Sequence, residues 1–239
     1  RGPGGPEGQH RHAHPGVSRP AGARPPAGNY GSGVPETDPA VAHTAGPAPD
    51  AALRNPIGAH LKVGTGLVTG ALARAREIGA ETLQVFVGNP RGWALSPGKP
   101  AVDEEFARLT AESGMRTFIH TPYLVNLGSP TPATYEKSVA VVAHNLRRAV
   151  EIGAEGVVVH TGSFVDPSGS RAAYDAAMRQ VREGLLPVLE QLDEHSPWLL
   201  LEPTAGQGRS LCAGVEDLGA YLAAVDHHPR AGICLDTCH

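Results

Sequence analysis

Side chains that bind metal ions or transfer protons stand at the ends of several short apolar runs. His120, His160, Glu202 and Asp236 end the runs RTFIH, GVVVH, WLLLE and GICLD, and His239 follows three residues after the last of them. One histidine in such a place is usually structural, but the repetition along successive runs favours a shared site. Imidazole and carboxylate groups together suit a divalent transition metal such as Zn²⁺ or Mn²⁺.

The residue types also indicate what such a metal site would do. Two imidazoles, from His120 and His160, and the carboxylate of Glu202 would leave one coordination position open for water. The second oxygen of Glu202 could bridge to another ion shared with Asp236. Two ions about 3.5–4 Å apart stabilise the attacking and leaving oxygens of a phosphodiester. We therefore predict a catalytic role for Glu202.

Other histidines and cysteines compete for the same role. Cys234 and Cys238 lack the spacing of a structural zinc site, so we expect both to be buried as small hydrophobic side chains. His60 lies two or three residues before the end of its predicted strand, where a core or supporting role fits as well as metal binding. His144 falls off the apolar face of a predicted helix, and we expect it to face solvent.

The elements that must position these residues alternate regularly from Pro56 onward. Short β-branched runs predict strands, and amphipathic stretches between them predict helices. Nearly continuous apolar strands separated by helices are typical of a parallel sheet, and in parallel barrels the active site lies at the carboxyl ends of the strands. The predicted strands are Ile57–Val63, Thr82–Val87, Arg116–His120, Gly156–His160, Pro197–Glu202 and Ala231–Asp236. The predicted helices are Val68–Ile78, Asp103–Ser113, Pro132–Ile152, Arg171–Asp193 and Val215–Val225.

The chain divides into two regions by composition. Residues 1–50 contain 10 prolines and 10 glycines and no Leu, Ile, Phe, Met or Trp. Such a segment cannot bury enough apolar surface to fold, so we expect residues 1–55 to be a disordered tail. Residues 56–239 are expected to form an α/β fold, an incomplete (β/α) TIM barrel with about six of the eight units that a barrel of roughly 250 residues contains.

Composition also excludes some classes of protein. The net charge of −4 argues against a strongly basic nucleic-acid arm, and no apolar run is long enough for a membrane span. Three late-clustered cysteines do not form the framework of a disulfide-rich secreted domain. We expect a cytoplasmic protein that is a monomer and does not contact membranes.

The motifs resemble those of the endonuclease IV family of apurinic/apyrimidinic endonucleases. The resemblance spans residues 57–239 and keeps the order of the family's motifs, and EPTAGQG and LDTCH together are highly specific. The matching stretches are IGAH (57–60), NPRGW (89–93), IHTPYLVNLGSP (119–130), VHTGS (159–163), EPTAGQG (202–208) and LDTCH (235–239).

The resemblance implies a trinuclear zinc TIM barrel that cleaves double-stranded DNA on the 5′ side of abasic sites in base excision repair. In that scheme His120 and His160 bind the first zinc, and Glu202 bridges it to the second. Asp236 then resembles a ligand of the second zinc, and His239 one of the third.

Two further residues resemble DNA contacts of the family. Arg91 corresponds to a loop residue that enters the minor groove, and Tyr123 to a side chain pushed into the base stack at the lesion. An abasic site has lost stacking, so an inserted ring and a guanidinium can hold the bent duplex open at reduced cost. Taken alone, Arg91 fits an ordinary solvated charge and Tyr123 a ring packed over a helix end.

The chain departs from the family pattern in three places. LKVGTG (61–66) replaces the run that the family commonly has after the first His, which we expect to alter the first DNA-contact loop. Pro203 stands where the family commonly has Asn, which we expect to affect only the local loop. The family takes four further zinc ligands from the region after LDTCH, where this chain ends. We therefore expect at most one fully liganded zinc site, with Mn²⁺ as an alternative metal, and impaired activity.

Two other functions compete with DNA cleavage. A xylose-isomerase-like metal-dependent sugar isomerase or epimerase would share the barrel and its ligands, but it would not need Arg91 and Tyr123. A protein that binds DNA lesions without hydrolysis would need phosphate contacts, for which Lys62, Arg91, Lys99 and Arg209 are available near the predicted metal rim.

Overall fold

A computed structural model of the chain describes residues 55–206 and 208–238. The predicted tail, apart from its last residue, and His239 lie outside these ranges. Within them no helix is both long and apolar enough to cross a membrane.

Six parallel strands form one sheet in the order of the sequence. All six predicted strands are present, and β3 and β4 have the predicted bounds. β1, β2 and β6 are shorter than predicted, and β5 begins one residue later, because backbone pairing covers only part of each predicted run. The strands are β1 (Gly58–His60), β2 (Thr82–Val85), β3 (Arg116–His120), β4 (Gly156–His160), β5 (Trp198–Glu202) and β6 (Ala231–Ile233).

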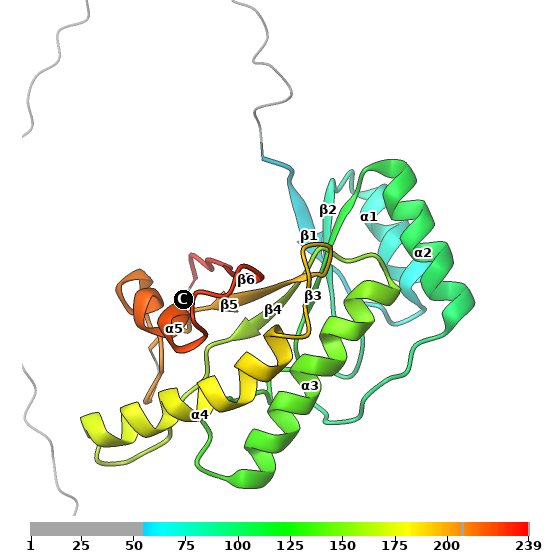
Figure 1. Cartoon of the computed structure of the whole chain (residues 1–239). Helices are drawn as coiled ribbons and strands as arrows, with labels where there is room; N and C mark the ends of the chain where they lie inside the picture. Colours follow the sequence, from blue (N-terminus) through cyan, green and yellow to red (C-terminus); the bar gives the residue numbers. More distant parts are fainter. Residues whose placement is uncertain (1–54, 207, 239) are drawn as a thin grey trace, which may run out of the picture. The chain divides into compact units, whose positions relative to one another are not determined.

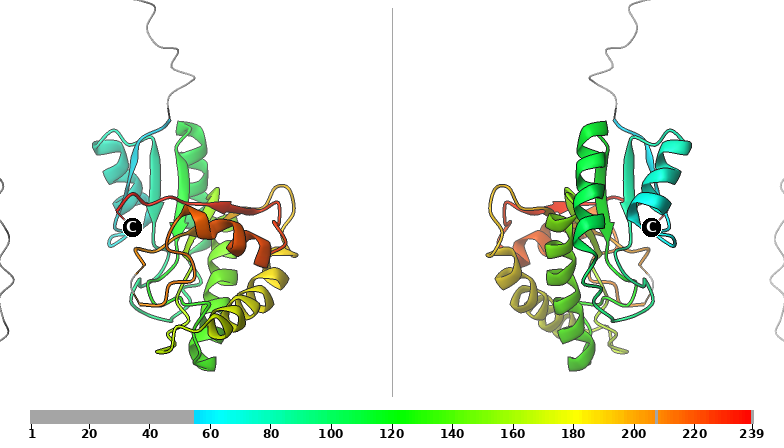
Figure 2. Two further views of the ribbon diagram at one scale, coloured as in Figure 1. Left: turned by 90° about the vertical axis from the view of Figure 1, so that its left-hand side faces the viewer. Right: turned by 90° about the vertical axis from the view of Figure 1, so that its right-hand side faces the viewer.

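Helices connect successive strands and lie along one side of the curved sheet (Figures 1 and 2). This arrangement is that of an incomplete (β/α) barrel, as the sequence predicts. The first predicted helix begins with a π-helical segment, and the last begins with a 3₁₀ turn. The helical elements are η2 (Leu67–Leu72), α1 (Ala73–Glu77), α2 (Pro100–Ser113), α3 (Pro132–Glu151), α4 (Arg171–Leu189), η3 (Val215–Asp217) and α5 (Leu218–Ala224).

Local signals explain where the longer helices begin. Pro100 and Pro132 open α2 and α3, at a position where the missing amide hydrogen is not needed. Ser170 caps α4, because its side chain accepts a hydrogen bond from the Ala173 amide.

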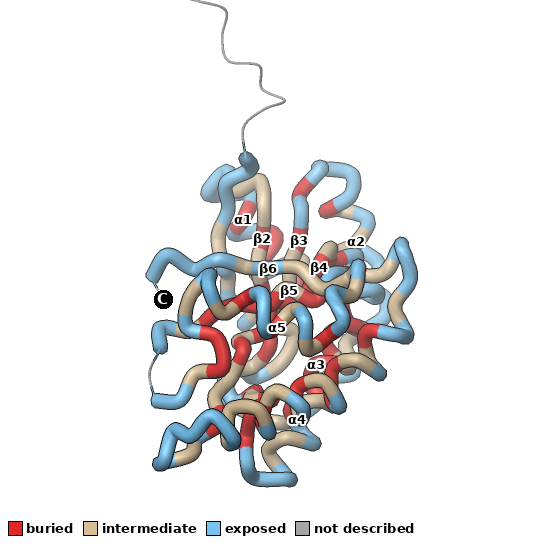
Figure 3. Tube along the Cα trace, turned by 60° about the vertical axis from the view of Figure 1, so that its left-hand side comes forward, coloured by how far each residue is buried: buried red, intermediate tan, exposed pale blue. Residues whose placement is uncertain are grey.

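The period-two alternation of the strands separates the core from the site. In β3, Thr117 and Ile119 are buried on one face, and Ile119 belongs to the hydrophobic core. Phe118 and His120 therefore point to the opposite face, which is the inside of the curved sheet. The buried stretches of the central strands are the red segments in Figure 3.

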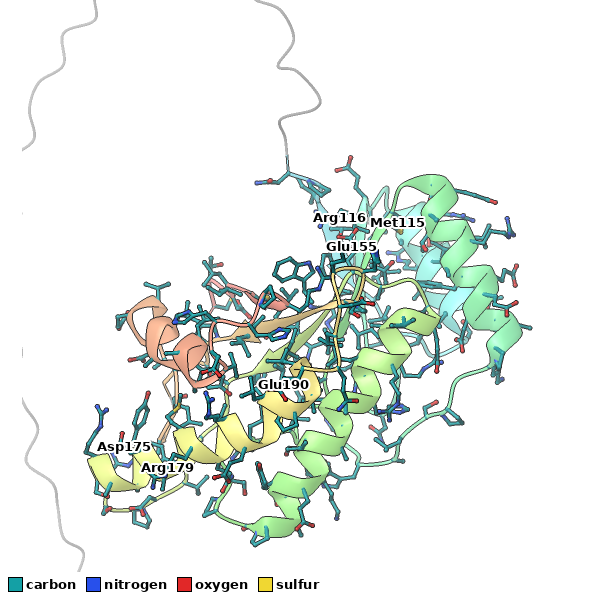
Figure 4. The ribbon with its side chains drawn as sticks, in the orientation of Figure 1. Met115, Arg116, Glu155, Asp175, Arg179 and Glu190 are labelled. Atoms are coloured by element: carbon teal, nitrogen blue, oxygen red, sulfur yellow. The ribbon has the colours of Figure 1, made fainter. Side chains whose placement is uncertain are left out.

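The amino-terminal ends of the strands carry a different kind of contact. Arg116, the first residue of β3, donates from Nε to both carboxylate oxygens of Glu155 at 2.9 and 2.8 Å, and Figure 4 shows the two side chains together. Both are substantially exposed, so the pair contributes at most about 1 kcal/mol to stability. The chemically interesting side chains lie at the other ends of the strands.

Candidate metal centre

Three of the predicted ligands lie together at the carboxyl ends of neighbouring strands. His120, His160 and Glu202 are the last residues of β3, β4 and β5. Each offers one ligand atom, and these atoms lie within 4.8 Å of one another. Glu202 Oε2 lies 3.2 Å from His120 Nε2 and 3.4 Å from His160 Nε2.

The hydrogen bonding of His120 indicates which of its nitrogens is available to a metal. His120 Nδ1 lies 2.7 Å from the carbonyl oxygen of Thr121. Because a carbonyl oxygen can only accept, Nδ1 carries a hydrogen, and in the neutral ring Nε2 keeps its lone pair. A histidine ligand is commonly oriented by such a bond from its other nitrogen to a backbone carbonyl.

This arrangement fits a cation between the three side chains. A neutral His120 directs the lone pair of Nε2 toward a carboxylate oxygen, so two acceptor atoms face each other at 3.2 Å. That contact is favourable when a proton or a metal ion lies between them. Two imidazoles and one carboxylate are a ligand set of catalytic zinc sites.

The centre is buried on one side and open on the other. Glu202 is 5% exposed and His120 is 8% exposed, whereas a quarter of the His160 side chain is accessible. A substrate can therefore approach from the side of His160. Burial strengthens the attraction of the carboxylate and the imidazoles for a cation bound between them, because the surroundings screen charge less than water does.

Asp236 and His239 are not part of the three-residue group in the described ranges. Asp236 lies beyond the end of β6, not at its last position as predicted, and its Oδ1 accepts a hydrogen bond of 2.7 Å from the Cys238 amide. The pKa of the Cys234 thiol is raised to about 11, mainly by burial and further by the charges of Glu202 and Asp236. Asp236 is thus close enough to Cys234 to affect the same thiol as Glu202 does. Cys234 is half-buried and Cys238 is exposed, so the expected burial is wrong for Cys238. His239 is outside the described residues.

An aromatic cluster connects the metal centre to its surroundings. The Tyr123 ring, 55% exposed, lies 6.0 Å from the His120 ring and 6.3 Å from the His160 ring. Phe86 packs beside both rings, 5.2 Å from Tyr123 and 5.4 Å from His120. Tyr123 is therefore an accessible ring next to two of the metal ligands.

His60 and Phe86 belong to this cluster, whereas the sequence leaves the role of His60 open and gives no sign of one for Phe86. His60 is the last residue of β1, not an interior one, and its ring lies 4.5 Å from Phe86 and 6.1 Å from His120. Burial lowers the pKa of His60, and electrostatic repulsion from His120 lowers it further. A shorter first strand, ending at His60, would have placed this histidine at a strand end like the three metal ligands.

Arg91 lies in the connection between β2 and α2, beside a cavity of about 1000 Å³. Arg91 is exposed, and a turn in which Asn89 Oδ1 accepts from the Arg91 amide at 3.0 Å fixes its backbone. Tyr123 and His60 line the same cavity, as do Lys62 and Lys99. Arg209, in contrast, donates to the backbone carbonyls of residues 166 and 167.

Comparison with known proteins identifies related sequences. A family model described as a xylose isomerase-like TIM barrel matches residues 72–239. A Streptomyces avermitilis protein named "Probable endonuclease 4" is 54% identical over 187 residues, which cover 78% of this chain and 59% of that protein. A Streptomyces coelicolor protein of the same name is 51% identical, covering 78% and 62%. The chain thus spans about three fifths of the length of these curated relatives.

Solved structures give a consistent result. Endonuclease IV from Thermus thermophilus is 35% identical, with a TM-score of 0.64 over 77% of this chain and 64% of that structure. A D-tagatose 3-epimerase-like protein is 18% identical, with a TM-score of 0.57 over 77% of this chain and 66% of that one. At that identity the second match shows a common fold and nothing more.

Proposed function

Because the chain belongs to the xylose isomerase-like TIM barrel family, within its endonuclease IV group, we propose that the protein is a metal-dependent endonuclease of DNA repair. Its substrate would be double-stranded DNA, hydrolysed 5′ to an abasic site. The observation that carries this proposal is the buried Glu202 carboxylate facing two imidazole nitrogens at 3.2 and 3.4 Å.

In this proposal His120, His160 and Glu202 would hold a zinc ion, and Asp236 and His239 would contribute to further zinc sites. A bound divalent ion supplies Lewis acidity, which stabilises the negative charge that develops on a phosphodiester under attack. Thr121 keeps His120 in the tautomer that ligation requires, through the bond to its carbonyl oxygen. Glu202 balances the positive charge of the site in a setting where water screens little.

Recognition of the lesion is assigned to Arg91 and Tyr123. The accessible ring of Tyr123 could fill the space that a missing base leaves, since a base–aromatic stack contributes about 1–3 kcal/mol. Arg91, with Lys62 and Lys99 on the same cavity, could neutralise backbone phosphates. A monomer would suffice, because all of these residues come from one chain.

A sugar isomerase or epimerase is less well supported. The relatives that are more than half identical carry the name endonuclease 4, whereas the epimerase-like structure shares the fold alone. A lesion-binding protein without hydrolysis remains a separate outcome of the experiment below.

The test is cleavage of a duplex with one abasic-site analogue, labelled at the 5′ end of the damaged strand. We expect a single product whose length places the cut 5′ to the lesion, and loss of cleavage after metal chelation. Glu202→Gln should lower the rate by about 100-fold or more, since even groups that merely support metal ligands affect activity 10- to 100-fold.

Glu194→Gln is the matched control, because the Glu194 side chain is 86% exposed. It should cleave like the unsubstituted protein. If the metal-loaded protein binds the abasic duplex tightly but does not cleave it, its function is lesion binding and not hydrolysis. Turnover of a ketose without any effect on DNA would replace the proposal altogether.

A further inference from the structure

The connection between β2 and α2, residues 86–99, carries Arg91 and contains no helix or strand. A long connection of this kind holds a defined shape only when other elements satisfy its backbone groups. We call residues 86–99 the arginine loop. Its anchors decide where Arg91 stands relative to the metal centre.

One helix, α3, anchors the second half of the arginine loop. His144 Nε2 lies 2.9 Å from the Ser96 carbonyl oxygen, so this nitrogen donates to it. Lys137, which lies earlier on the same helix, places its ammonium 5.9 Å from the ring centroid of Trp93. His144 is half-buried under the loop, which corrects the expectation that it faces solvent.

Arg148, one turn after His144, joins the end of the arginine loop to α2. Its guanidinium donates to both oxygens of Asp103 at 2.8 and 2.9 Å and to the Pro97 carbonyl at 3.4 Å. Asp103 in turn accepts a hydrogen bond of 2.9 Å from the Lys99 amide. Arg148 and Asp103 are 3% and 4% exposed, so a planar, bidentate pair is buried at this corner.

The backbone of Gly98 is shaped around this guanidinium. Gly98 has φ +75°, and a Cβ built there would lie 2.1 Å from Arg148 Nη1. The guanidinium therefore fills the space that a side chain at position 98 would need. At the other end of the loop the Tyr123 amide donates to the Pro90 carbonyl at 3.0 Å. Arg91 lies between these two sets of anchors.

We propose that His144 and Arg148 are positioning residues, which hold the arginine loop so that Arg91 is presented beside the metal centre. They act through the loop backbone, His144 on the Ser96 carbonyl and Arg148 on the Pro97 carbonyl. The inference rests on the proposed function, because it takes Arg91 to be a DNA contact. It adds that the outer helix α3 sets the affinity for damaged DNA.

The test uses His144→Phe and Arg148→Lys in the full chain. His144→Phe keeps a ring but removes the donor to Ser96. Arg148→Lys keeps the charge but removes the planar fork, so the two-nitrogen pairing with both oxygens of Asp103 is lost. Arg147→Lys is the matched control, because Arg147 is the exposed neighbour on the same helix.

Two readouts separate positioning from folding. Hydrogen–deuterium exchange should become faster in peptides from residues 86–99 in both variants and stay unchanged in β3 to β5 and in Arg147→Lys. The dissociation constant for abasic duplex should rise about two- to tenfold, the equivalent of one lost hydrogen bond, with zinc content unchanged. With Arg91→Ala already present, His144→Phe should raise the constant less than twofold, since coupled positions are not additive.

Unchanged loop exchange in both variants would overturn the inference. An undiminished effect of His144→Phe in the Arg91→Ala background would also overturn it, because His144 would then act without Arg91. If the unsubstituted protein does not bind abasic duplex, the proposed function itself fails. If it binds and both variants bind equally well, the positioning role alone is wrong.

Discussion

At the scale of single residues, the metal centre follows from strand register. β4 and β5 are parallel with His160 directly opposite Glu202, and His120 ends the next strand. Side chains at the carboxyl ends of neighbouring parallel strands meet on the same rim. The sequence alone was therefore sufficient to predict that these three residues lie together.

Other residues could not be placed from the sequence. His144 is covered by the arginine loop, and a loop without periodicity gives no sign of which helix it will cover. Asp236 was assigned to the end of a strand because GICLD is apolar up to that residue, whereas pairing of β6 ends at Ile233. The shape of a loop depends on contacts that are distant in sequence.

Tyr123 should determine the preference for damaged over intact duplex. Tyr123→Ala removes an accessible ring next to the metal centre, and we expect the preference for abasic duplex to fall about tenfold, the value of roughly one stacking contact. Tyr123→Phe should retain most of the preference, since the ring provides the stacking surface. Competition binding with intact duplex measures both. Equal losses in the two variants would point to the hydroxyl instead.

His144 should make stability depend on pH. Burial, followed by the charges of Arg147 and Arg148, lowers its pKa, although the Ser96 bond and Glu151 oppose this shift. Below about pH 6.5 the unfolded chain therefore takes up a proton that the folded protein accepts less readily, so acid lowers the free energy of unfolding.

The measurement is denaturant unfolding of the unsubstituted protein and His144→Phe at two pH values. At pH 7.5 the variant should be less stable by about 1 kcal/mol, through loss of the Ser96 bond. At pH 5.5 the difference should shrink, because only the unsubstituted protein still carries the titrating group at this position. A difference that grows on acidification would contradict this explanation.

At the scale of elements, β3 and β4 were predictable to the residue because turn-forming or charged residues bound their apolar runs. The π-helical start of the first helix was not, because a period of 3.6 does not reveal a local widening of the backbone. The corner where the arginine loop enters α2 was also hidden, since it depends on Arg148 from another helix.

Gly98 tests that corner. Gly98→Ala introduces a Cβ both at positive φ and against the Arg148 guanidinium, so we expect a loss of about 3 kcal/mol or more as the buried pair with Asp103 is disturbed. Gly114→Ala is the matched control, with φ +67° and no atom within 4 Å of its added Cβ.

The control should cost only about 1–2 kcal/mol, the strain of a left-handed conformation. Equilibrium unfolding in denaturant measures both variants. If the two substitutions lowered the free energy of unfolding equally, the Arg148 guanidinium would be able to move away from the added Cβ and still keep its pairing with Asp103.

At the scale of the whole molecule, the order of the strands leaves β1 and β6 as the two edges of the described sheet. Ile57, Ile233 and Leu235 are 73%, 43% and 62% exposed at or beside these edges. The alternation of strands and helices sufficed to predict the barrel class. Which apolar residues stay exposed depended on the ends of pairing, which composition does not reveal.

Edges of this kind promote association between chains. We expect the 239-residue chain to be a monomer at low concentration and to associate as its concentration rises. Ile233→Lys should reduce this association, because a charge on an edge strand opposes pairing. Val150→Lys is the control, since Val150 is 66% exposed but lies on α3. Sedimentation velocity over a range of concentrations measures the effect. An equal reduction in both variants would indicate a general effect of charge.

The hydrogen bond between the Tyr123 amide and the Pro90 carbonyl has one more consequence. It links the segment that carries the Tyr123 ring directly to the segment that carries the Arg91 guanidinium. In the proposed complex the two side chains would therefore enter the duplex in one concerted motion. A base pair that blocks one of them would then exclude both.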